Sequence, residues 1–461
     1  MQAVEPQPKP RIMDLQLLRR YGGPVPRYTS YPTAPHFHPG ITAETYLGWL
    51  GGLAPDARLS LYLHVPFCAQ MCWYCGCHTK VVRRYEPIAD YAGSLAQEAA
   101  MVAAALPEGP RVVQVHWGGG TPTMLGGDDF RRLSDSLRES FGFDEAAEIA
   151  VEIDPRSLDA EKAAALAAAG VTRASLGVQD FNPAVQRAIN RVQPYEVTAR
   201  AVELLRDAGV RSLNLDLMYG LPKQWVADLL HSVDLAAGLA PERIALFGYA
   251  HVPWMKTHQR LIKDSDLPKT TARWAQAEAA AARLQALGYL RIGFDHFARP
   301  EDPLAVAMIQ GRLRRNFQGY TDDPAEALIG LGASAIGGLP QGFVQNAVPI
   351  KDYRAAIAAG RPAVQRGCRL SDDDRLRGAV IEDLMCRLRV DLAKVCARQG
   401  ADPAVFTEEL ETLKDMAADG LVEIEGSEVR VTEPGRPLLR SAAAVFDSYL
   451  KAGKARHSRA V

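Results

Sequence analysis

The sequence predicts an α/β protein built on a parallel sheet, either an open doubly wound sheet or a full or partial barrel. Two observations lead to this fold class. From about Ser60 onward, short runs rich in valine, isoleucine and leucine alternate with helical patterns. Polar and glycine-rich segments stand directly after the strand-like runs, where parallel α/β folds carry their sites. The clustering of such segments favours an enzyme over a scaffold.

The alternation predicts a series of strands with helices between them. The strands are expected at residues 60–66, 112–117, 148–153, 173–178, 212–218 and 243–249. The helices are expected at residues 87–105, 128–141, 159–169, 195–208 and 223–238. The segments that follow the strands are residues 64–77, 118–121, 152–154, 179–180, 216–222 and 249–251. Because parallel strands end at the same edge of a sheet, we expect these segments to meet there.

The pattern changes after about Pro340. Residues 371–461 are predicted to be helical, with a short hairpin at 421–432 whose turn is EGSE. The expected organisation is an N-terminal arm at residues 1–54, a barrel at 55–340, and a linker with a small helical domain at 341–461. The arm has few helical or strand periodicities and holds several prolines, which favours an extended cover over the active site. A disordered tail is the alternative.

Composition excludes several classes of partner. The chain has 461 residues, of which 48% are apolar and 23% charged, and a formal net charge of −1. A helical domain with a hairpin also occurs in DNA-binding proteins, but this charge balance gives no general attraction to nucleic acid or anionic lipid. The sequence shows no signal-peptide core and no bilayer-spanning apolar run. We therefore expect a cytoplasmic protein, with a monomer as the default.

Four of the seven cysteines crowd between Cys68 and Cys77. Cys68, Cys72 and Cys75 form C-x3-C-x2-C, which suits three thiolates on one iron–sulfur cluster with one iron left open. Cys77 is too close to Cys75 to grip a second corner of the same cube easily. A zinc site that adds His78 is the competing interpretation, although zinc ligands usually come as two separated pairs. The other cysteines are expected to be ordinary thiols; they are Cys368, Cys386 and Cys396.

A C-x3-C-x2-C motif directly after the first strand resembles the signature of the radical S-adenosylmethionine (SAM) superfamily. The chain further resembles the oxygen-independent coproporphyrinogen III oxidases nearly end to end. The resemblance is carried by PRYTSYPT (26–33), HVPFC (64–68), CGC (75–77), HWGGGTPT (116–123), VEIDPR (151–156), LGVQDFN (176–182), YGLPKQ (219–224), DHFARP (295–300) and NFQGYT (316–321). It implies a partial (β/α) radical SAM barrel with a helical C-terminal domain.

The resemblance also implies cofactors and site residues. The implied cofactors are a [4Fe-4S] cluster on Cys68, Cys72 and Cys75, and two molecules of SAM. The implied catalytic side chains are Tyr62 and Cys77. The residues implied to contact SAM are Tyr62, Tyr74, Gly119, Gly120, Thr121, Glu152, Gln179, Arg191, Asp216, Ala250 and Ile336. From the sequence alone, Tyr62, Ala250 and Ile336 would be assigned to the core, and Arg191 could be a solvated charge.

The implied reaction is oxidative decarboxylation of two propionate side chains of coproporphyrinogen III to vinyl groups, giving protoporphyrinogen IX in haem biosynthesis. An electron donor such as a flavodoxin or ferredoxin is implied, and the final electron acceptor is not identified. The substrate carboxylates need cationic partners, for which the candidates are Arg27, Arg299, Arg315 and Lys223. Alternatives are a haem chaperone or haem-modifying enzyme on the same barrel, and a zinc-stabilised structural protein.

Overall fold

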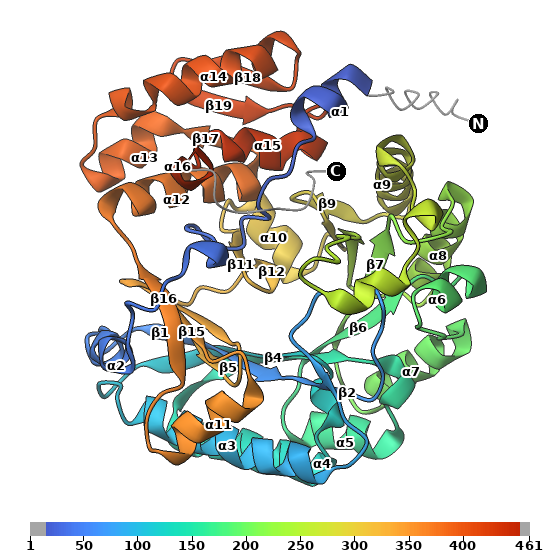
Figure 1. Ribbon diagram of the computed structural model, residues 1–461, viewed down its shortest axis with the longest axis vertical. Helices are drawn as coiled ribbons and strands as arrows, with labels where there is room; N and C mark the ends of the chain where they lie inside the picture. Colours follow the sequence, from blue (N-terminus) through green and yellow to red (C-terminus); the bar gives the residue numbers. More distant parts are fainter. Residues whose placement is uncertain (1–14, 452–461) are drawn as a thin grey trace.

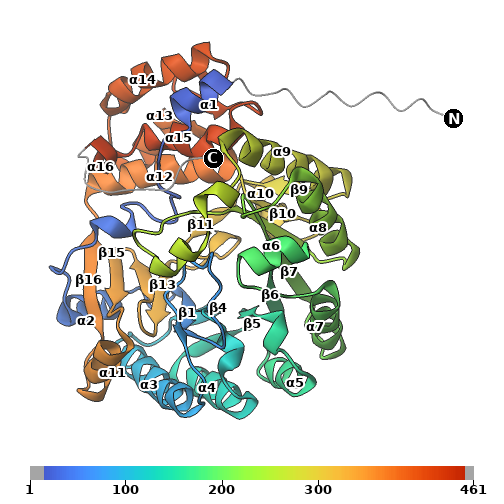
Figure 2. The same ribbon diagram turned by 45° about the vertical axis from the view of Figure 1, so that its right-hand side comes forward.

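The computed structural model describes residues 15–451, in which a large sheet and its helices form one part and the C-terminal helices another (Figures 1 and 2). Expectations for residues 1–14 and 452–461 lie outside the described residues. In both views the C-terminal helices sit above the sheet, and helix α1 lies beside them. Within the described part of the chain, no helix has the length and apolar character needed to cross a bilayer.

The large sheet has twelve strands in the order β16-β15-β14-β13-β1-β4-β5-β6-β7-β8-β10-β9. The run from β13 to β8 is parallel, and the strands beyond it on both sides are antiparallel. The sheet ends at β16 and β9, so the barrel is open. The central strands are β1 (Arg58–Val65), β4 (Arg111–Gly119), β5 (Gly142–Ile153), β6 (Arg173–Gln179), β7 (Ser212–Tyr219) and β8 (Arg243–Gly248). The six expected strands are therefore confirmed.

Helices follow the parallel strands and form an outer layer around the sheet (Figure 2). They are α3 (Glu86–Ala103), α4 (Gly127–Ser140), α5 (Ala160–Ala168), α6 (Pro183–Ala188), α7 (Tyr195–Asp207), α8 (Val226–Gly238) and α9 (Thr270–Ala286). The five expected helices are confirmed, and their ends have recognisable causes. Helix α5, for example, begins after Asp159, whose side chain accepts the Lys162 N–H as an N-cap. The fully buried Leu59, Leu61 and Leu63 of β1 mark the middle of the core.

The boundary expected near Pro340 is wrong, because the sheet continues to Arg369. Strands β13 (Ala327–Leu331), β14 (Ile336–Leu339), β15 (Gly342–Asn346) and β16 (Val364–Arg369) extend it, and α11 (Ile350–Ala358) lies between the last two. At the other edge β9 (Leu290–Ile292) and β10 (His296–Ala298) pair antiparallel with each other. These strands are short and rich in glycine, so their periodicity is too weak to separate them from loops.

The C-terminal part is mainly helical, as expected, around its own core. Its elements are α12 (Asp372–Arg387), β17 (Arg389–Asp391), α13 (Leu392–Gln399), α14 (Thr407–Ala418), β18 (Val422–Glu425), β19 (Glu428–Val431), α15 (Leu439–Ala444) and α16 (Ser448–Lys451). The expected hairpin is confirmed as β18 and β19, with Gly426 in the left-handed conformation at its turn. The third strand, β17, has only three residues and was not expected.

The arm is more structured than the sequence indicates. It holds α1 (Leu15–Tyr21) and α2 (Ala43–Gly51), and the stretch between them is largely extended. Leu18 lies in the C-terminal core, whereas Trp49 and Leu50 lie in the core of the large sheet. A description of residues 1–54 as a cover alone is therefore wrong. The arm also binds the far end of the chain, since the Tyr28 hydroxyl donates to Asp447 at 3.0 Å.

A buried carboxylate fixes the turn between β13 and β14. Glu98 of α3 is 2% exposed and accepts hydrogen bonds from the Gly332 N–H at 2.6 Å, the Asn346 amide at 2.6 Å and the Tyr353 hydroxyl at 2.7 Å. The turn, β15 and α11 are thereby joined to α3. Because each donor is itself buried, loss of the carboxylate leaves several polar groups unsatisfied at once.

We predict that Glu98→Ala destabilises the fold by at least about 2 kcal/mol, because each buried donor left without a partner is costly. The measurement is the urea unfolding midpoint, compared with that of the wild type. Glu98→Gln serves as the matched control, since it keeps the shape and one acceptor oxygen and should fall between the two. A Glu98→Ala midpoint equal to the wild-type midpoint would show that the network does not contribute to stability.

Candidate active site

The segments after the parallel strands come together at one edge of the sheet. The register of the parallel strands brings the ends of neighbouring strands next to each other. Val65 of β1 is paired with Gly119 of β4, and Ile153 of β5 is paired with Leu176 of β6. The cysteine loop leaves β1 at this edge. Parallel pairing therefore supplies the shared location, and the individual loops supply the side chains.

The cysteine loop closes on itself. Strand β2 (Phe67–Cys68) pairs with β3 (Lys80–Val81), so the residue after the loop returns beside the first cysteine. Carbonyl groups along the loop are held by side chains from elsewhere: Asn190 donates to Met71 at 2.8 Å, Gln259 to Tyr74 at 2.9 Å and Lys256 to Cys77 at 2.9 Å. The loop thus has the tight wrap that convergent thiol ligands require.

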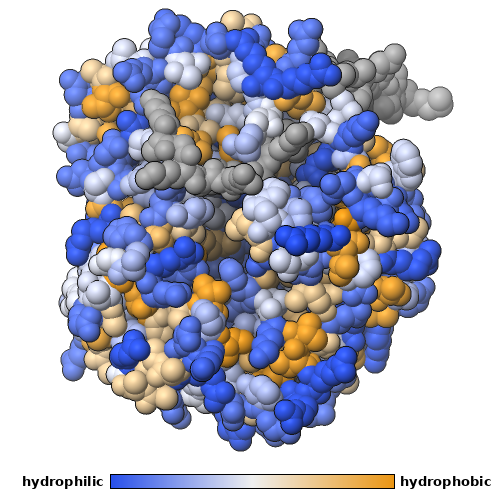
Figure 3. All heavy atoms as spheres, viewed as in Figure 1, coloured by the Kyte–Doolittle hydropathy of each residue, from blue (hydrophilic) through white to orange (hydrophobic). Residues whose placement is uncertain are grey.

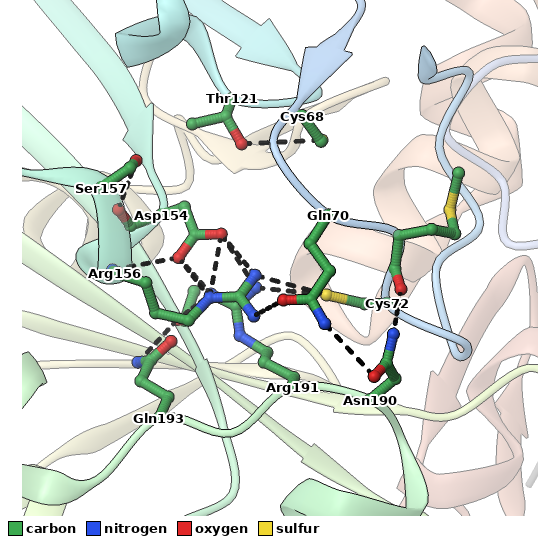
Figure 4. Close-up of polar contacts among 12 residues, drawn as sticks. Cys68, Gln70, Cys72, Thr121, Asp154, Arg156, Ser157, Asn190, Arg191 and Gln193 are labelled. Carbon is green, nitrogen blue, oxygen red and sulfur yellow. Dashed lines mark hydrogen bonds and ion pairs between the residues drawn. The ribbon is translucent and has the colours of Figure 1, made fainter. Parts of the chain in front are cut away.

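Each of the three thiols in the motif accepts a hydrogen bond from a different neighbour, and Figure 4 shows the bonds to Cys68 and Cys72. The Thr121 hydroxyl donates to Cys68 Sγ at 3.6 Å, and the backbone N–H of Cys77 donates to Cys75 Sγ at 3.4 Å. Cys72 Sγ accepts from the guanidinium groups of Arg156 and Arg191, both at 3.6 Å. Donors of this kind stabilise thiolates, the form in which cysteine binds a metal.

The chemistry of the three thiols suits an iron–sulfur cluster, which takes soft thiolate ligands. Cluster thiolates bind different corners of an inorganic cube, so their sulfur atoms stand apart. Among residues 15–451, no three His, Cys, Asp or Glu side chains converge closely enough to hold one metal ion. The zinc site that would include His78 is therefore not formed there. The backbone carbonyl of His78 instead accepts a hydrogen bond from His64 Nε2 at 3.0 Å.

Cys77 differs from the other cysteines of the loop. It is exposed, and its thiol lies close enough to Cys75 for a hydrogen bond that lowers the pKa of Cys75 to about 6. The same hydrogen bond, with Cys75 as acceptor, raises the pKa of Cys77 well above its usual value. The Cys77 thiol is therefore a hydrogen-bond donor to Cys75.

A buried ion-pair group stands behind Cys72. Asp154, directly after β5, pairs with Arg156 at 2.6 Å and with Arg191 at 3.3 Å (Figure 4). Burial alone would raise the pKa of the Asp154 carboxyl, but the hydrogen bond from Arg156 and the charges of both arginines hold it below its usual value. Arg191 also donates to the Gly177 carbonyl at 2.6 Å. The thiol of Cys72 therefore lies next to the guanidinium groups of Arg156 and Arg191, and both of these form ion pairs with Asp154.

Gln179 and Arg191 lie over a glycine. A Cβ placed on Gly177 would lie 3.0 Å from Gln179 Nε2 and 3.1 Å from Arg191 Nη2, so any larger residue would press on both side chains. Gln179 itself has a positive φ of 72°, which a non-glycine residue rarely adopts. Such an outlier beside the cysteine loop is typical of a ligand site.

The interior of the barrel carries a second polar group around Tyr62. The Tyr62 hydroxyl and His64 Nδ1 are 3.1 Å apart, and the Tyr62 ring stacks on His116 with 5.9 Å between centroids. His116 Nε2 lies 3.1 Å from Glu152 Oε1, while the Gly119 N–H donates to Glu152 Oε2 at 3.2 Å. Burial lowers the pKa of His64, so its ring is neutral, donates to the His78 carbonyl and accepts from Tyr62.

Asp216 lies on β7 and faces the same interior. It accepts from the Asn214 amide at 2.7 Å and from the Ser175 hydroxyl at 3.2 Å. Burial, with the nearby charge of Glu152, raises its pKa to about 6. A cavity of about 250 Å³ is lined by both carboxylates. These two groups can bind hydroxyl or ammonium groups, since both are hydrogen-bond acceptors when ionised.

The remaining expected SAM contacts surround these groups. Gly119 adopts a φ of 111°, which brings its backbone against the His64 ring, and the Gly120 N–H donates to the Val65 carbonyl at 2.9 Å. The ring of Tyr74 packs with Ile189 and Tyr249. Ile336 begins β14 and is half-buried, and Ala250 follows β8. Ala250 lines a larger cavity that opens at this edge of the sheet.

This larger cavity has a volume of about 840 Å³ and a cationic wall. Figure 3 shows a hollow near the middle of the same face, below the C-terminal part. Five cationic side chains and two carboxylates line the cavity; they are Arg27, Lys269, Arg273, Arg291, Arg440, Glu278 and Asp295. Burial and the charge of Arg27 lower the pKa of Arg440 to about 10, which shows how closely the positive charges are held.

Only one of the four expected carboxylate partners lines this cavity. Arg27 does, and it also donates to the Gly248 carbonyl at 3.1 Å. Arg315 is buried and lies 3.9 Å from Asp295 without lining the cavity. Arg299 stacks on the Tyr289 ring at 4.1 Å, and Lys223 lies 3.8 Å from Asp266, so neither faces the cavity. The cavity therefore does not support the expectation for Arg299 and Lys223, because local partners hold both side chains elsewhere.

Several residues at the site were not singled out from the sequence. Asp154 and Arg156 stand within the quoted VEIDPR motif, and a charged pair directly after a strand is a signal that could have identified them. His64 and His116 also follow or end strands. Arg440 gives no such signal, because it lies on α15 and reaches the cavity only through the packing of the C-terminal part against the sheet.

Comparison with known families gives two matches along the chain. Residues 62–236 match the family described as the Radical SAM superfamily, and residues 370–438 match the HemN C-terminal domain. The first range begins on β1 and includes the cysteine loop and the strands up to β7. The second range covers most of the C-terminal part, and its start agrees with the end of the large sheet at Arg369.

Curated relatives extend over almost the whole chain. A protein of Bradyrhizobium diazoefficiens named oxygen-independent coproporphyrinogen III oxidase is 52% identical, over 95% of this chain and 97% of its own length. A protein of Paracoccus denitrificans with the same name is 44% identical, over 97% and 99% of the two chains. The solved coproporphyrinogen III oxidase (HemN) of Escherichia coli, described as a radical SAM enzyme, superposes with a TM-score of 0.89 at 39% identity, over 95% and 99% of the two chains.

We predict that Cys68→Ser, Cys72→Ser and Cys75→Ser each abolish the brown absorbance and bound iron of the reconstituted protein. A serine hydroxyl is a hard ligand and replaces a soft thiolate poorly. Cys77→Ser is the matched control from the same loop and should retain its iron, because Cys77 acts as a donor to Cys75. Full iron content in Cys72→Ser, or complete loss in Cys77→Ser, would contradict this ligand set.

We predict that substitution of Arg191 lowers both bound iron and SAM affinity, whereas substitution of Asp216 lowers SAM affinity alone. Asp216→Asn should keep the cluster and weaken SAM binding roughly tenfold or more, the expected loss of a charged hydrogen bond. Arg191→Met should also lower iron content, because its guanidinium contacts Cys72, Asp154 and the Gly177 carbonyl. The measurements are bound iron and SAM affinity by equilibrium dialysis. Equal iron in both variants would show that Arg191 does not support the loop.

Proposed function

The chain belongs to the family of oxygen-independent coproporphyrinogen III oxidases, and we propose on that basis that it oxidatively decarboxylates coproporphyrinogen III. Two propionate side chains lose carbon dioxide and become vinyl groups, which gives protoporphyrinogen IX in haem biosynthesis. One observation carries the proposal: the closed loop of three cysteines lies at the same edge of the sheet as a large cavity with a cationic wall. A polycarboxylate substrate suits such a wall.

The proposed cofactors are a [4Fe-4S] cluster held by Cys68, Cys72 and Cys75, and SAM. When bound, the reduced cluster would supply one electron to SAM, whose carbon–sulfur bond would break to give methionine and a carbon radical that takes a hydrogen atom from the substrate. The residues of this chain bind and orient these groups. Thr121, Arg156 and Arg191 would stabilise the thiolates by donating hydrogen bonds to Cys68 and Cys72. Tyr62 and Cys77 are the proposed catalytic side chains.

Two SAM molecules form part of the proposal. The residues proposed for them fall into two groups. The interior group around Tyr62, Glu152 and Asp216 can bind ribose hydroxyls and an ammonium. The group around Thr121, Gln179 and Arg191 lies next to the loop, where a guanidinium can bind a carboxylate. The remaining contacts proposed to line these sites are Tyr74, Gly119, Gly120, Ala250 and Ile336.

The cationic cavity is proposed to hold the substrate carboxylates. Coproporphyrinogen III carries four propionates, of which two keep their carboxylates throughout the reaction. Arg27 and Arg440 come from opposite ends of the chain and both line the cavity. Arg440 is buried and Arg27 is exposed, and two guanidinium groups that line one cavity suit an anionic ligand. Asp295 partly balances them and leaves an excess of positive charge.

The cellular setting is proposed on chemical grounds. A compartment that keeps thiols reduced suits a cluster on three free cysteines, and this is the cytoplasm. An acidic one-electron donor such as a flavodoxin or ferredoxin would supply the reaction, and the protein is proposed to act as a monomer without nucleic acid or membrane. A haem chaperone or haem-modifying role is not favoured, since the relatives that match nearly end to end carry the oxidase name.

The proposal is tested by anaerobic incubation of the reconstituted protein with coproporphyrinogen III, SAM and a reductant, with the product identified by mass. Arg27→Gln should raise the KM for the porphyrinogen by roughly ten- to a hundredfold, the loss of one charged hydrogen bond. It should also raise the amount of 5′-deoxyadenosine formed per vinyl group, because the substrate is positioned less well.

Lys223→Gln is the matched control, since Lys223 is exposed and does not line the cavity. It should leave both quantities unchanged. Point variants are preferable to removal of the arm, because α1 is part of the C-terminal core. Absence of a vinyl product in the wild type would refute the function, whereas equal KM values for the two variants would refute only the assignment of Arg27.

A further inference from the structure

A basic patch lies beside the cysteine loop on the outer surface of the protein. It is a hollow of about 460 Å³, and its cationic side chains are Lys80, Arg83, Arg84, Lys351 and Arg354. No carboxylate is among the described residues that line it. Arg354 pairs with Asp90 at 3.2 Å, but the other four have no carboxylate within ion-pair distance in the described part of the chain. Lys80, Arg83, Arg84 and Lys351 are all exposed.

This concentration of charge does not follow from the composition. The whole chain has a net charge of −1, so the patch contrasts with the rest of the molecule. Two helices also begin at its border, α3 at Glu86 and α11 at Ile350, and both views show these helices side by side (Figures 1 and 2). The partial positive charge at each helix start adds to that of the side chains.

Apolar side chains lie within the hollow and next to it in the sequence. Phe67 and Ile350 line the hollow together with the cations. Val81 and Tyr85, which flank Arg83 and Arg84 in the sequence, are 38% and 41% exposed. Exposed apolar side chains next to charged ones are typical of a surface that binds another protein. A site for a small anion would instead enclose its ligand with few donors.

The patch is next to a proposed cluster ligand. Strand β3 carries Lys80 and Val81, and it pairs directly with β2, in which Cys68 stands opposite Val81. Paired strands lie about 5 Å apart, so a protein docked on β3 is one strand away from the backbone of Cys68. The cavity proposed for the substrate is lined by other elements, chiefly the arm, α9 and α15, and shares no lining residue with the patch.

We propose that the basic patch docks an acidic one-electron carrier, a flavin or iron–sulfur protein that reduces the cluster. The inference rests on the proposed function, because that reaction requires an electron from outside the chain. In this step the carrier loses one electron and the bound cluster gains it, with no bond made or broken. Charge attraction would steer the carrier to the patch, and the exposed Val81 and Tyr85 would contact it directly.

The test is titration of an acidic flavodoxin, in its oxidised form, into the cluster-containing protein at low and high salt. Arg83→Glu combined with Arg84→Glu should weaken binding at low salt roughly tenfold or more, since both the attraction and its salt dependence come from these charges. Arg211→Glu combined with Arg389→Glu is the matched control. Both of these residues are exposed and lie away from the patch, and the pair changes the net charge equally.

A second measurement follows cluster reduction by absorbance. Reduction by flavodoxin should slow in the patch variant, whereas reduction by a small uncharged photoreductant should not. Equal flavodoxin affinity in the patch and control variants, or binding of anionic lipid vesicles in place of flavodoxin, would overturn the proposal. Patch-dependent binding without any vinyl product under the photoreductant would refute the oxidase function and leave the docking surface standing.

Discussion

The arrangement of the site depends on one buried guanidinium, that of Arg191. It lies between Asp154 after β5, the Gly177 carbonyl of β6 and the thiol of Cys72 on the loop. A charge in such a place is tolerated only because the carboxylate and the carbonyl satisfy it, and removing one partner would leave the others uncompensated. The pair of Asp154 and Arg191 therefore sets the distance between the sheet edge and the cysteine loop. The side chains of Asn190, Gln259 and Lys256 then hold the rest of the loop through its backbone carbonyl groups.

Closure of the cavity follows from a second set of contacts, between the two ends of the chain. Helix α1 packs in the C-terminal core, and α2 packs in the core of the sheet. The extended stretch between them is held by Tyr28 to Asp447 and by Tyr31 to Ser448. Arg27 thus reaches the cavity from one end of the chain and Arg440 from the other. A site that handles radical intermediates must exclude water, and this joint wall provides a physical means.

Local pattern was enough to predict the parallel strands, their helices and the position of the cysteine loop. Strands such as β1 bury several leucines in succession, and that signal survives without any tertiary information. The extension of the sheet by β14 to β16 could not be predicted in the same way, since its strands gain their stability from neighbours far along the chain. The resemblance supplied most of the site residues. It could not place Arg299 or Lys223, whose orientation is decided by Tyr289 and Asp266.

The three thiols of the loop have different hydrogen-bond donors, and these donors differ in charge. Cys72 faces two arginines, Cys75 faces the Cys77 donor, and Cys68 accepts only from a neutral hydroxyl. Burial accordingly raises the pKa of Cys68 to about 11, while the contact with Cys77 lowers that of Cys75 to about 6. Of the three thiols, Cys68 is the one whose donor carries no charge and belongs to neither the loop nor an arginine. It is also the thiol whose strand, β2, pairs with β3. The loop therefore presents the basic patch on the side of the thiol that has no charged donor, whereas the fixed guanidinium groups stand behind Cys72.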